Sequence, residues 1–558
     1  MYKHKFLTSV VVISLLTSIL GSSCSKQIDD AYLNPNAGVV EPIEQLLPSV
    51  IANMVAGGNT GNTGNGLAGD DLQIGRYVQY WAQNSDDYIY DQMGGTTGNS
   101  GGVLGYVWTM HYATMGQNVS KIIEWGSQQK KWDYVGVANA IRAWSWLTLS
   151  DEYGNIILRE AFQLSRTQFD YDTLQAEAYD TVRATAYRAL NYLSMTGDSV
   201  SQTNLAKGDA YFYNGDVSKW KKFVYGVLAR SYAHLTNKPD FKTKYADSVL
   251  KYVDLAMTQN SDNAMVQMAN TGVSYTMNYF GPTRSNVGSI RQGAFIANLM
   301  SGNNTVYPGV QDPRIWYMLR ENANGTFKGI RPTYGAIGDV GLGTNDLPQN
   351  FFGGSYTVTS GSETTARYAF RNESPWAIMT ASEMKFLKAE AAYRKGDKAT
   401  ALQAYTDGIN LHFDFLRNNP IYDFSTNVPP ADLITDASQQ AYMAAVVPTD
   451  PNALTLTEIM EQKYIALFVW GTHETWVDMR RYHYTDQDPD RPGYQVYTDW
   501  VPLASTDLAL ANNQKYVYRA RPQNTSEYQY NILAVTAMGG TATDYCTREV
   551  WFSTTAAQ

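Results

Sequence analysis

The stretch Glu383–Ile409 constrains the fold more than any other part of the chain. It reads EMKFLKAEAAYRKGDKATALQAYTDGI and contains two amphipathic helical patterns that meet at Gly396 and Asp397. Glycine after one helix and aspartate before the next are favoured capping residues, so the pattern predicts a helix–turn–helix. Its length and its small residues, which let two helices approach closely, are typical of a tetratricopeptide-type hairpin. The small residues are Ala389, Ala391, Ala392, Ala399, Ala401 and Ala404.

Other helical patterns of similar length occur in consecutive pairs, with capping residues at their ends. Three tryptophans on the apolar stripes, Trp144, Trp146 and Trp220, are expected in the core. We therefore predict a mainly α fold, built as a tetratricopeptide-like scaffold of stacked helical hairpins. The predicted N-terminal caps are Asp172 with Gln175, Asp216, and Thr455 with Glu458, and the predicted helix ends are Gly154 and Gly471.

Two long stretches lack these helical stripes, residues 261–376 and 485–558. They are rich in Gly, Asn, Ser, Thr and Tyr, although QKYVYRARPQN at 514–524 suggests a short strand. A Gly/Asn-rich loop is expected at Gly57–Asp71, without the Gly-Lys-Ser/Thr ending of a phosphate-binding loop. Long irregular segments of this kind usually carry function. Because scaffold helices interrupt them, we expect residues 43–558 to form one discontinuous domain with long loop insertions and a few short strands.

The N-terminus has the three parts of a secretory signal peptide. Lys3 and Lys5 precede a run of 15 uncharged residues, 6–20, and then small residues lead to Cys24. The run is shorter than the roughly 20 residues that cross a bilayer. We predict a signal peptide at 1–23, lipid attachment at Cys24 and an anchor segment at 24–42, although Leu20 lies four positions before the cysteine rather than three. The alternative is ordinary secretion with an incidental cysteine.

Composition narrows the possible ligands. The net charge of −9 becomes −11 once residues 1–23, with two lysines and no acids, are removed, which disfavours nucleic acid as a partner. With 41 Tyr and 13 Trp, the chain is rich in rings that offer an apolar face and a polar handle. Such rings suit sugars, whose C–H faces stack while their hydroxyls form hydrogen bonds. Packing in helix cores is the alternative role, expected for more than half of them.

Cys546 has no disulfide partner once Cys24 carries lipid, and we expect it to be a small buried hydrophobe.

Motifs of catalysis are absent from the sequence. There is no Gly-x-Ser-x-Gly elbow and no His-Glu-x-x-His, and the six histidines offer little for a zinc cluster. The stretch DQDPD at 486–490 could ligate Ca²⁺, but a solvated turn is the favoured interpretation because the Gly and distal Glu of a calcium loop are missing. Two carboxylates at a glycosidase spacing are not excluded by sequence. The pattern favours binding over catalysis, with no catalytic residue, no cofactor and an open question over metal.

Seven motifs in order give the chain a resemblance to a known family, the SusD/RagB outer-membrane lipoproteins of Bacteroidetes. This sequence looks more similar to the SusD-like 2 branch of the family than to its starch-binding founder. The sequence departs from the family motifs at two places. Ser150 intervenes before Asp151, and Glu527 lies one position later than the Glu of the family motif. The motifs are DAYLNPNAG (30–38), AIRAWSWLTLSDEYGNI (140–156), YFYNGDVSKWKKFVYGVLAR (211–230), QDPRIWYM (311–318), SEMKFLKAEAAYRKGD (382–397), EIMEQKYIALFVWGTHETWVDMRR (458–481) and RARPQNTSEYQYN (519–531).

The resemblance implies a function. Family members are tethered by lipid to the outside of the outer membrane, cap a SusC-like TonB-dependent transporter, and pass oligosaccharides or, in some cases, peptides into its barrel. The chain is then a glycan-binding lipoprotein and no enzyme. The alternatives are a peptide-binding member, a surface glycoside hydrolase on a helical scaffold, and a structural lipoprotein that binds only its transporter.

Ligand groups in the family come from loops near the N-terminal third and from the long insertion. No family motif fixes the ligand residues, so the choice here rests on loop context, and core packing is the alternative for each. The expected ligand-binding residues are Trp81, Tyr88, Tyr90, Asp91, Tyr275, Tyr279, Phe280, Arg284, Arg291, Trp316 and Tyr334.

Overall fold

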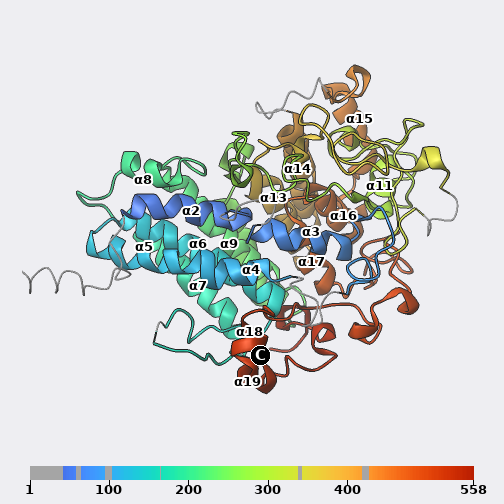
Figure 1. Cartoon of the computed structure of the whole chain (residues 1–558). Coiled ribbons are helices and arrows are strands. Elements are labelled where there is room, and N and C mark those ends of the chain that lie inside the picture. Colours follow the sequence, from blue (N-terminus) through green and yellow to red (C-terminus); the bar gives the residue numbers. More distant parts are fainter. Residues whose placement is uncertain are drawn as a thin grey trace, which may run out of the picture.

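Helices, many of them packed against their neighbours in sequence, are the main regular structure of the computed structural model (Figure 1). The structure describes residues 42–57, 64–94, 104–163, 165–336, 342–417 and 427–557. The predicted signal peptide, Cys24 and nearly all of the anchor segment lie outside these residues. Within them, no helix combines the length and the apolar character that a membrane span needs.

The first group of helices comes from the N-terminal half of the chain and lies together in Figure 1. The long central helix α6 packs against its neighbours α5, α7 and α9, while α2 packs on α5 and α8. These helices are α2 (Ile43–Val55), α5 (Gly116–Gln128), α6 (Trp132–Tyr153), α7 (Gln175–Tyr192), α8 (Gln202–Asp209), α9 (Val217–Ala233) and α10 (Ala246–Leu255). Trp144, Trp146 and Trp220 are buried here, which confirms their predicted core role.

The predicted hairpin at 383–409 is confirmed. Helix α13 (Ala381–Lys395) ends at Gly396, which adopts a left-handed φ of 87°. Helix α14 (Lys398–Arg417) follows, with the Asp397 carboxylate accepting the Thr400 backbone N–H at 3.1 Å. Five of the six alanines are buried and Ala399 is exposed. Helix α13 also packs against α10 and α16, so the hairpin joins the first helical group to the second.

The second group continues toward the C-terminus and is interrupted by irregular chain. Short helices α3 (Leu67–Tyr77) and α4 (Tyr106–Thr109) lie between α2 and α5 in the sequence, and α3 packs against α17. The remaining helices are α11 (Ala294–Ser301), α12 (Ile315–Met318), α15 (Asp436–Val446), α16 (Leu456–Ala466), α17 (Thr472–Arg481), α18 (Glu527–Tyr530) and α19 (Ile532–Ala537).

In the described part of the chain, four short strands form two antiparallel pairs, which agrees with the few strands predicted. Strand β1 (Trp81–Gln83) pairs with β3 (Ile290–Gln292), and β2 (Ala264–Val266) pairs with β4 (Trp376–Met379). The predicted strand at 514–524 is wrong. The Tyr518 and Ala520 N–H groups donate to the carbonyls of Cys546 and Glu152, so no single neighbouring strand completes a ladder.

Three of the five predicted caps and helix ends are confirmed, and two differ. Asp216 and Thr455 cap α9 and α16, and Gly154 ends α6 with φ 70°. Asp172 does not open α7, which begins at Gln175, because its carboxylate instead accepts the backbone N–H groups of Leu158 and Arg159. Helix α16 stops at Ala466, and Gly471 immediately precedes α17 rather than ending α16.

The predicted loop at Gly57–Asp71 is too long. Helix α3 begins within it, because Leu67 and Ala68 pack into the core. Asp70, from the same turn, accepts hydrogen bonds from three successive backbone N–H groups, those of Gly105, Tyr106 and Val107.

The buried Cys546 agrees with its predicted role as a small apolar side chain.

The hairpin turn offers a direct test of the scaffold. Gly396→Ala should lower the free energy of unfolding by about 1 kcal/mol, because the left-handed backbone disfavours a Cβ atom. A Cβ there meets no neighbouring atom, so the cost is that of the backbone alone. Urea denaturation measures the change.

Gly343→Ala is the matched control, since its φ is −73° and its nearest neighbour for a Cβ atom is 3.8 Å away. It should be neutral or slightly stabilising. Equal losses in the two variants would contradict a left-handed cap at Gly396.

Candidate ligand-binding groove

A hollow of about 330 Å³ lies where the end of α3, the start of α11 and two distant loops meet. The β1–β3 pair aligns these segments, because Gly293 donates its N–H to the Tyr80 carbonyl and Ala294 donates to the Ile330 carbonyl. Gln79 Nε2 donates a hydrogen bond to the Val501 carbonyl at 2.8 Å, which connects the C-terminal loop to these segments. The hollow, called here the groove, is lined by Gln79, Ala294, Phe295, Asn298, Arg331, Pro332, Tyr334, Asp499, Val501, Pro502, Leu503, Ala504 and Asp507.

Two exposed tyrosines stand beside each other at this groove. Tyr334 lines it, and Tyr88 meets the Tyr334 ring edge-on, with ring centroids 6.2 Å apart and an angle of 78° between the planes. Tyr88 is 58% exposed and Tyr334 is 38% exposed. Their hydroxyls donate to Asp86 at 3.2 Å and to Asp507 at 3.0 Å, respectively. The pair therefore presents apolar ring faces to solvent with carboxylates at their polar ends.

A buried aspartate holds the two tyrosine loops together. Asp91 accepts the Arg76 Nε–H at 2.5 Å, and its other oxygen accepts the backbone N–H groups of Gln83 and Thr333. Asp87 donates its backbone N–H to the Thr333 carbonyl and forms an ion pair with Arg76. Burial raises the pKa of Asp91, but the Arg76 guanidinium and the Thr333 N–H group oppose that rise. Asp91 thus acts by positioning the Tyr88 loop against the segment that bears Tyr334.

Of the predicted ligand residues, the structure brings only Tyr88 and Tyr334 together at an exposed surface. Tyr275 is exposed beside a different cavity. Tyr90 is half-buried under the Arg76 guanidinium, 5.1 Å from its ring centroid. Trp316 is half-buried and packs edge-on against Phe327 at 4.7 Å.

The other six predicted residues are buried, and Arg284 among them lines the same cavity as Tyr275. Trp81 packs edge-on against Phe280, and the Arg284 guanidinium lies over the Tyr279 ring. Arg291 donates to backbone carbonyls, among them those of Gly288 and Val358. The buried residues are Trp81, Asp91, Tyr279, Phe280, Arg284 and Arg291.

Several groove residues were missed by the sequence reasoning. These include the polar residues Gln79, Asn298, Arg331, Asp499 and Asp507. The last two come from the segment 485–558, which the sequence marked as irregular without singling out a side chain. No sequence pattern signals that residues near 500 lie beside residues near 330, because the contact is made by tertiary packing alone.

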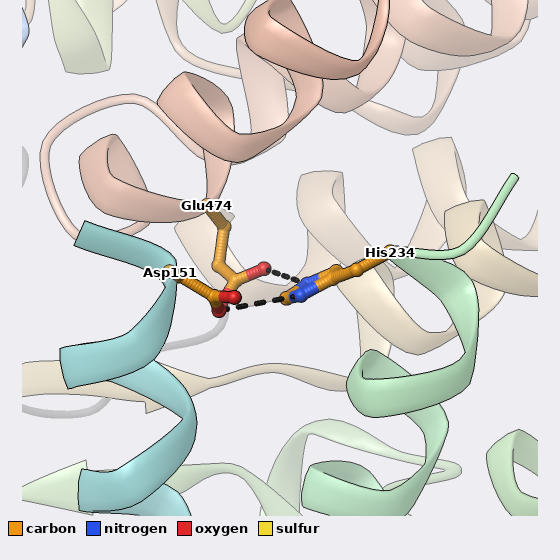
Figure 2. A group of neighbouring side chains, drawn as sticks. All are labelled: Asp151, His234 and Glu474. Carbon is orange, nitrogen blue, oxygen red and sulfur yellow. Dashed lines mark hydrogen bonds and ion pairs between the residues drawn. The ribbon is translucent and has the colours of Figure 1, made fainter. Parts of the chain in front are cut away.

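A second cluster of titratable groups is buried among the helices and has the composition of a metal site (Figure 2). His234 lies between Asp151 of α6 and Glu474 of α17, with Nδ1 3.3 Å from one carboxylate and Nε2 2.9 Å from the other. Arg230 pairs with Glu474 at 3.1 Å and with Glu383 of α13 at 2.6 Å. The cluster therefore connects α6, α9, α13 and α17.

Electrostatics favour a charge network over a metal ion at this cluster. Burial disfavours a charged imidazole, but the carboxylates of Asp151 and Glu474 outweigh it and raise the pKa of His234 to about 9. With both ring nitrogens protonated and facing carboxylates, the imidazolium has no lone pair to give a metal. We interpret the cluster as a structural ion network.

The carboxylates of DQDPD also face protein donors. Asp488 accepts the backbone N–H and hydroxyl of Thr457, and Asp490 accepts from Tyr393 and Lys398. Asp486 faces His483 at 2.7 Å. The three side chains therefore have different protein partners, which favours the predicted turn over a shared cation.

Comparison with known proteins gives one family and many similar folds. Residues 35–496 match the SusD-like_2 family, described as starch-binding and associating with the outer membrane. A SusD/RagB family protein from Bacteroides thetaiotaomicron superposes with a TM-score of 0.67 and 20% identity, over 92% of this chain and 98% of that one. A chitin-binding SusD homologue from Flavobacterium johnsoniae gives 0.61 and 19%, over 92% and 99%. No curated protein matches the sequence.

The ion network predicts a pH dependence of stability. Because the folded pKa of His234 lies above the ordinary 6.5, its charge contributes stability that is complete below pH 6.5 and is lost as the pH rises through about 9. The contribution is about 3 kcal/mol. We expect His234→Gln to lower the free energy of unfolding at pH 6 and to differ less from wild type at pH 10, as measured by urea denaturation.

The comparison isolates His234, since Glu152 and Lys238, whose pKa values are also shifted, titrate in both proteins. His483→Gln is the control, because this half-buried surface histidine should contribute less than about 1 kcal/mol. A wild-type minus His234→Gln difference that stays constant from pH 6 to 10 would rule out a charged His234.

Proposed function

Because the chain belongs to the SusD-like family of outer-membrane-associated proteins, we propose that it captures oligosaccharides at the cell surface and delivers them to a SusC-like TonB-dependent transporter. The observation that carries the proposal is the exposed Tyr88–Tyr334 pair beside a groove lined with polar side chains. The chitin-binding homologue with the same fold supports a glycan as ligand.

The proposed binding mode combines stacking with hydrogen bonding. Sugar C–H faces lie on the Tyr88 and Tyr334 rings, and sugar hydroxyls reach Asp507, Asn298 and Arg331 along the groove. Each aromatic contact contributes about 0.5–1.5 kcal/mol, so the affinity is modest. Modest affinity suits a protein that must release its ligand to a transporter.

The proposed anchor is a lipid on Cys24. It rests on the sequence, in which an uncharged run and small residues precede this cysteine. A lipid-bearing N-terminus would hold the helical scaffold at the outer membrane, on the cell surface, next to the transporter.

Binding without catalysis fits the carboxylates of the groove. Asp507 accepts the Tyr334 hydroxyl, and Asp499, which is exposed, accepts the Thr305 backbone N–H and hydroxyl. A glycosidase needs one buried acid of raised pKa facing a second carboxylate. Neither aspartate of the groove is buried, which supports the non-enzymatic interpretation over a surface glycoside hydrolase.

Loss of either tyrosine should weaken glycan binding. Tyr88→Ala and Tyr334→Ala are each expected to raise the Kd of the best oligosaccharide by roughly 2- to 12-fold, which is the stacking free energy converted to affinity. A glycan array, with a peptide pool beside it, identifies that ligand, and isothermal titration measures the Kd.

Tyr530→Ala is the control, since this tyrosine is 73% exposed on α18 and lies outside the groove. Unchanged glycan affinity in both groove variants would refute the site. Binding of peptides but no glycans would favour the peptide-binding alternative, and hydrolysis of the glycan by the purified chain would overturn the proposal of a non-enzymatic receptor.

Charge at the groove predicts a preference for uncharged glycans. The charged residues that line the groove are Asp499, Asp507 and Arg331. A further carboxylate, Asp86, accepts the hydroxyl of the adjoining Tyr88. A neutral oligosaccharide should therefore bind more tightly than a uronic acid oligomer of equal length, by about 1 kcal/mol or roughly fivefold at low salt.

Asp507→Asn keeps an acceptor for the Tyr334 hydroxyl and should narrow this difference, whereas Asp198→Asn, an exposed site outside the groove, should leave it unchanged. Titration of both ligands at low and high salt checks the preference. Tighter binding of the acidic oligomer would contradict it.

A further inference from the structure

A second cavity lies between helix α2 and the segment 266–277, and it differs in chemistry from the groove. Its volume is about 380 Å³, within the range of small-molecule sites, and it shares no lining residue with the groove. Apolar atoms form most of its wall, and its polar side chains include Asn53, Gln267, Thr271, Thr276 and Arg284. The apolar walls include Pro48, Ile51, Ala52, Val266, Met268 and Met277.

One buried polar atom in this cavity wall has no hydrogen-bonding partner. Asn53 of α2 is 3% exposed, and its Nδ2 donates to the carbonyl and hydroxyl of Ser49 at 2.8 and 3.4 Å. Its Oδ1 accepts no hydrogen bond from the residues that the structure describes. Buried acceptors are normally satisfied, and an unsatisfied one costs free energy that a ligand donor would recover. The cavity therefore has a place for one N–H or O–H group on an otherwise apolar ligand.

Aromatic and sulfur groups also line the cavity. Tyr211 and Tyr275 are 57% and 50% exposed, so their rings are accessible from solvent. Met268 and Met277 belong to the wall, and thioether sulfur makes favourable contacts with the edges of aromatic rings. Tyrosine faces and methionine sulfur together favour a flat aromatic ligand over an alkyl chain.

We propose that this cavity binds a small aromatic ring carrying a single hydrogen-bond donor, of the phenol or indole type. The ring lies between the apolar wall and the exposed tyrosines, and its O–H or N–H donates to Asn53 Oδ1. The same chemistry is found in free phenols and indoles and in the side chains of tyrosine and tryptophan. The site is independent of the glycan proposed for the groove.

Paired probes test the donor. Saturation-transfer NMR on the full chain in detergent should show p-cresol binding roughly five- to tenfold more tightly than toluene, which has the same ring without the hydroxyl. In Asn53→Leu this preference should disappear, because the acceptor is lost. N-acetyl-tyrosinamide, used as a third probe, distinguishes a peptide side chain from a free phenol by its relative affinity.

A second variant keeps the test decisive if Asn53→Leu does not fold. Ala52→Phe fills the cavity from its wall and should abolish binding of p-cresol and toluene, whereas Tyr530→Ala should alter neither. Saturating oligosaccharide should not displace p-cresol, since the two sites share no residue. Absence of p-cresol binding, equal binding of the two probes to wild type, or binding unaffected by both cavity variants would overturn the proposal.

Discussion

The buried ion pairs around His234 are the interaction on which the rest of the structure depends. An imidazolium between Asp151 and Glu474, with Arg230 bridging to Glu383, connects four helices that lie far apart in the sequence. Removing one member leaves an uncompensated charge inside the protein, which costs far more than losing a surface ion pair. Pairing of these buried charges therefore favours the observed packing of the four helices.

That arrangement is transmitted to the groove through helices α16 and α17. Tyr80 donates its hydroxyl to the Tyr464 carbonyl and lies 2.8 Å from the Thr475 hydroxyl. The next residue, Trp81, begins β1, whose pairing with β3 sets the position of the Tyr88 loop. Asp91 then fixes this loop to the backbone of Thr333, beside Tyr334. A helical scaffold thus orients two tyrosines that are themselves on irregular chain.

The scaffold was largely predictable from sequence because its signals are local. Gly396 and Asp397 specify a helix end and a helix start within two residues, and Asp216 caps α9 as expected. Asp172 failed as a cap because, in the tertiary structure, its carboxylate accepts the backbone N–H of Leu158 instead. Local patterns do not reveal such competition.

The groove was predictable only in part, because it depends on contacts between distant segments. Tyr88 and Tyr334 were found from loop context, yet the same context suggested Trp81 and Arg291, which are buried. An aromatic or arginine side chain on an irregular segment serves the core as readily as a ligand, and sequence does not separate the two. Asp499 and Asp507 were missed because their proximity to Tyr334 arises only on folding. A structure of the protein bound to its best oligosaccharide tests the central claim most directly. The account predicts sugar rings stacked on Tyr88 and Tyr334 with a hydroxyl on Asp507, and a sugar bound elsewhere with this groove unoccupied would contradict it.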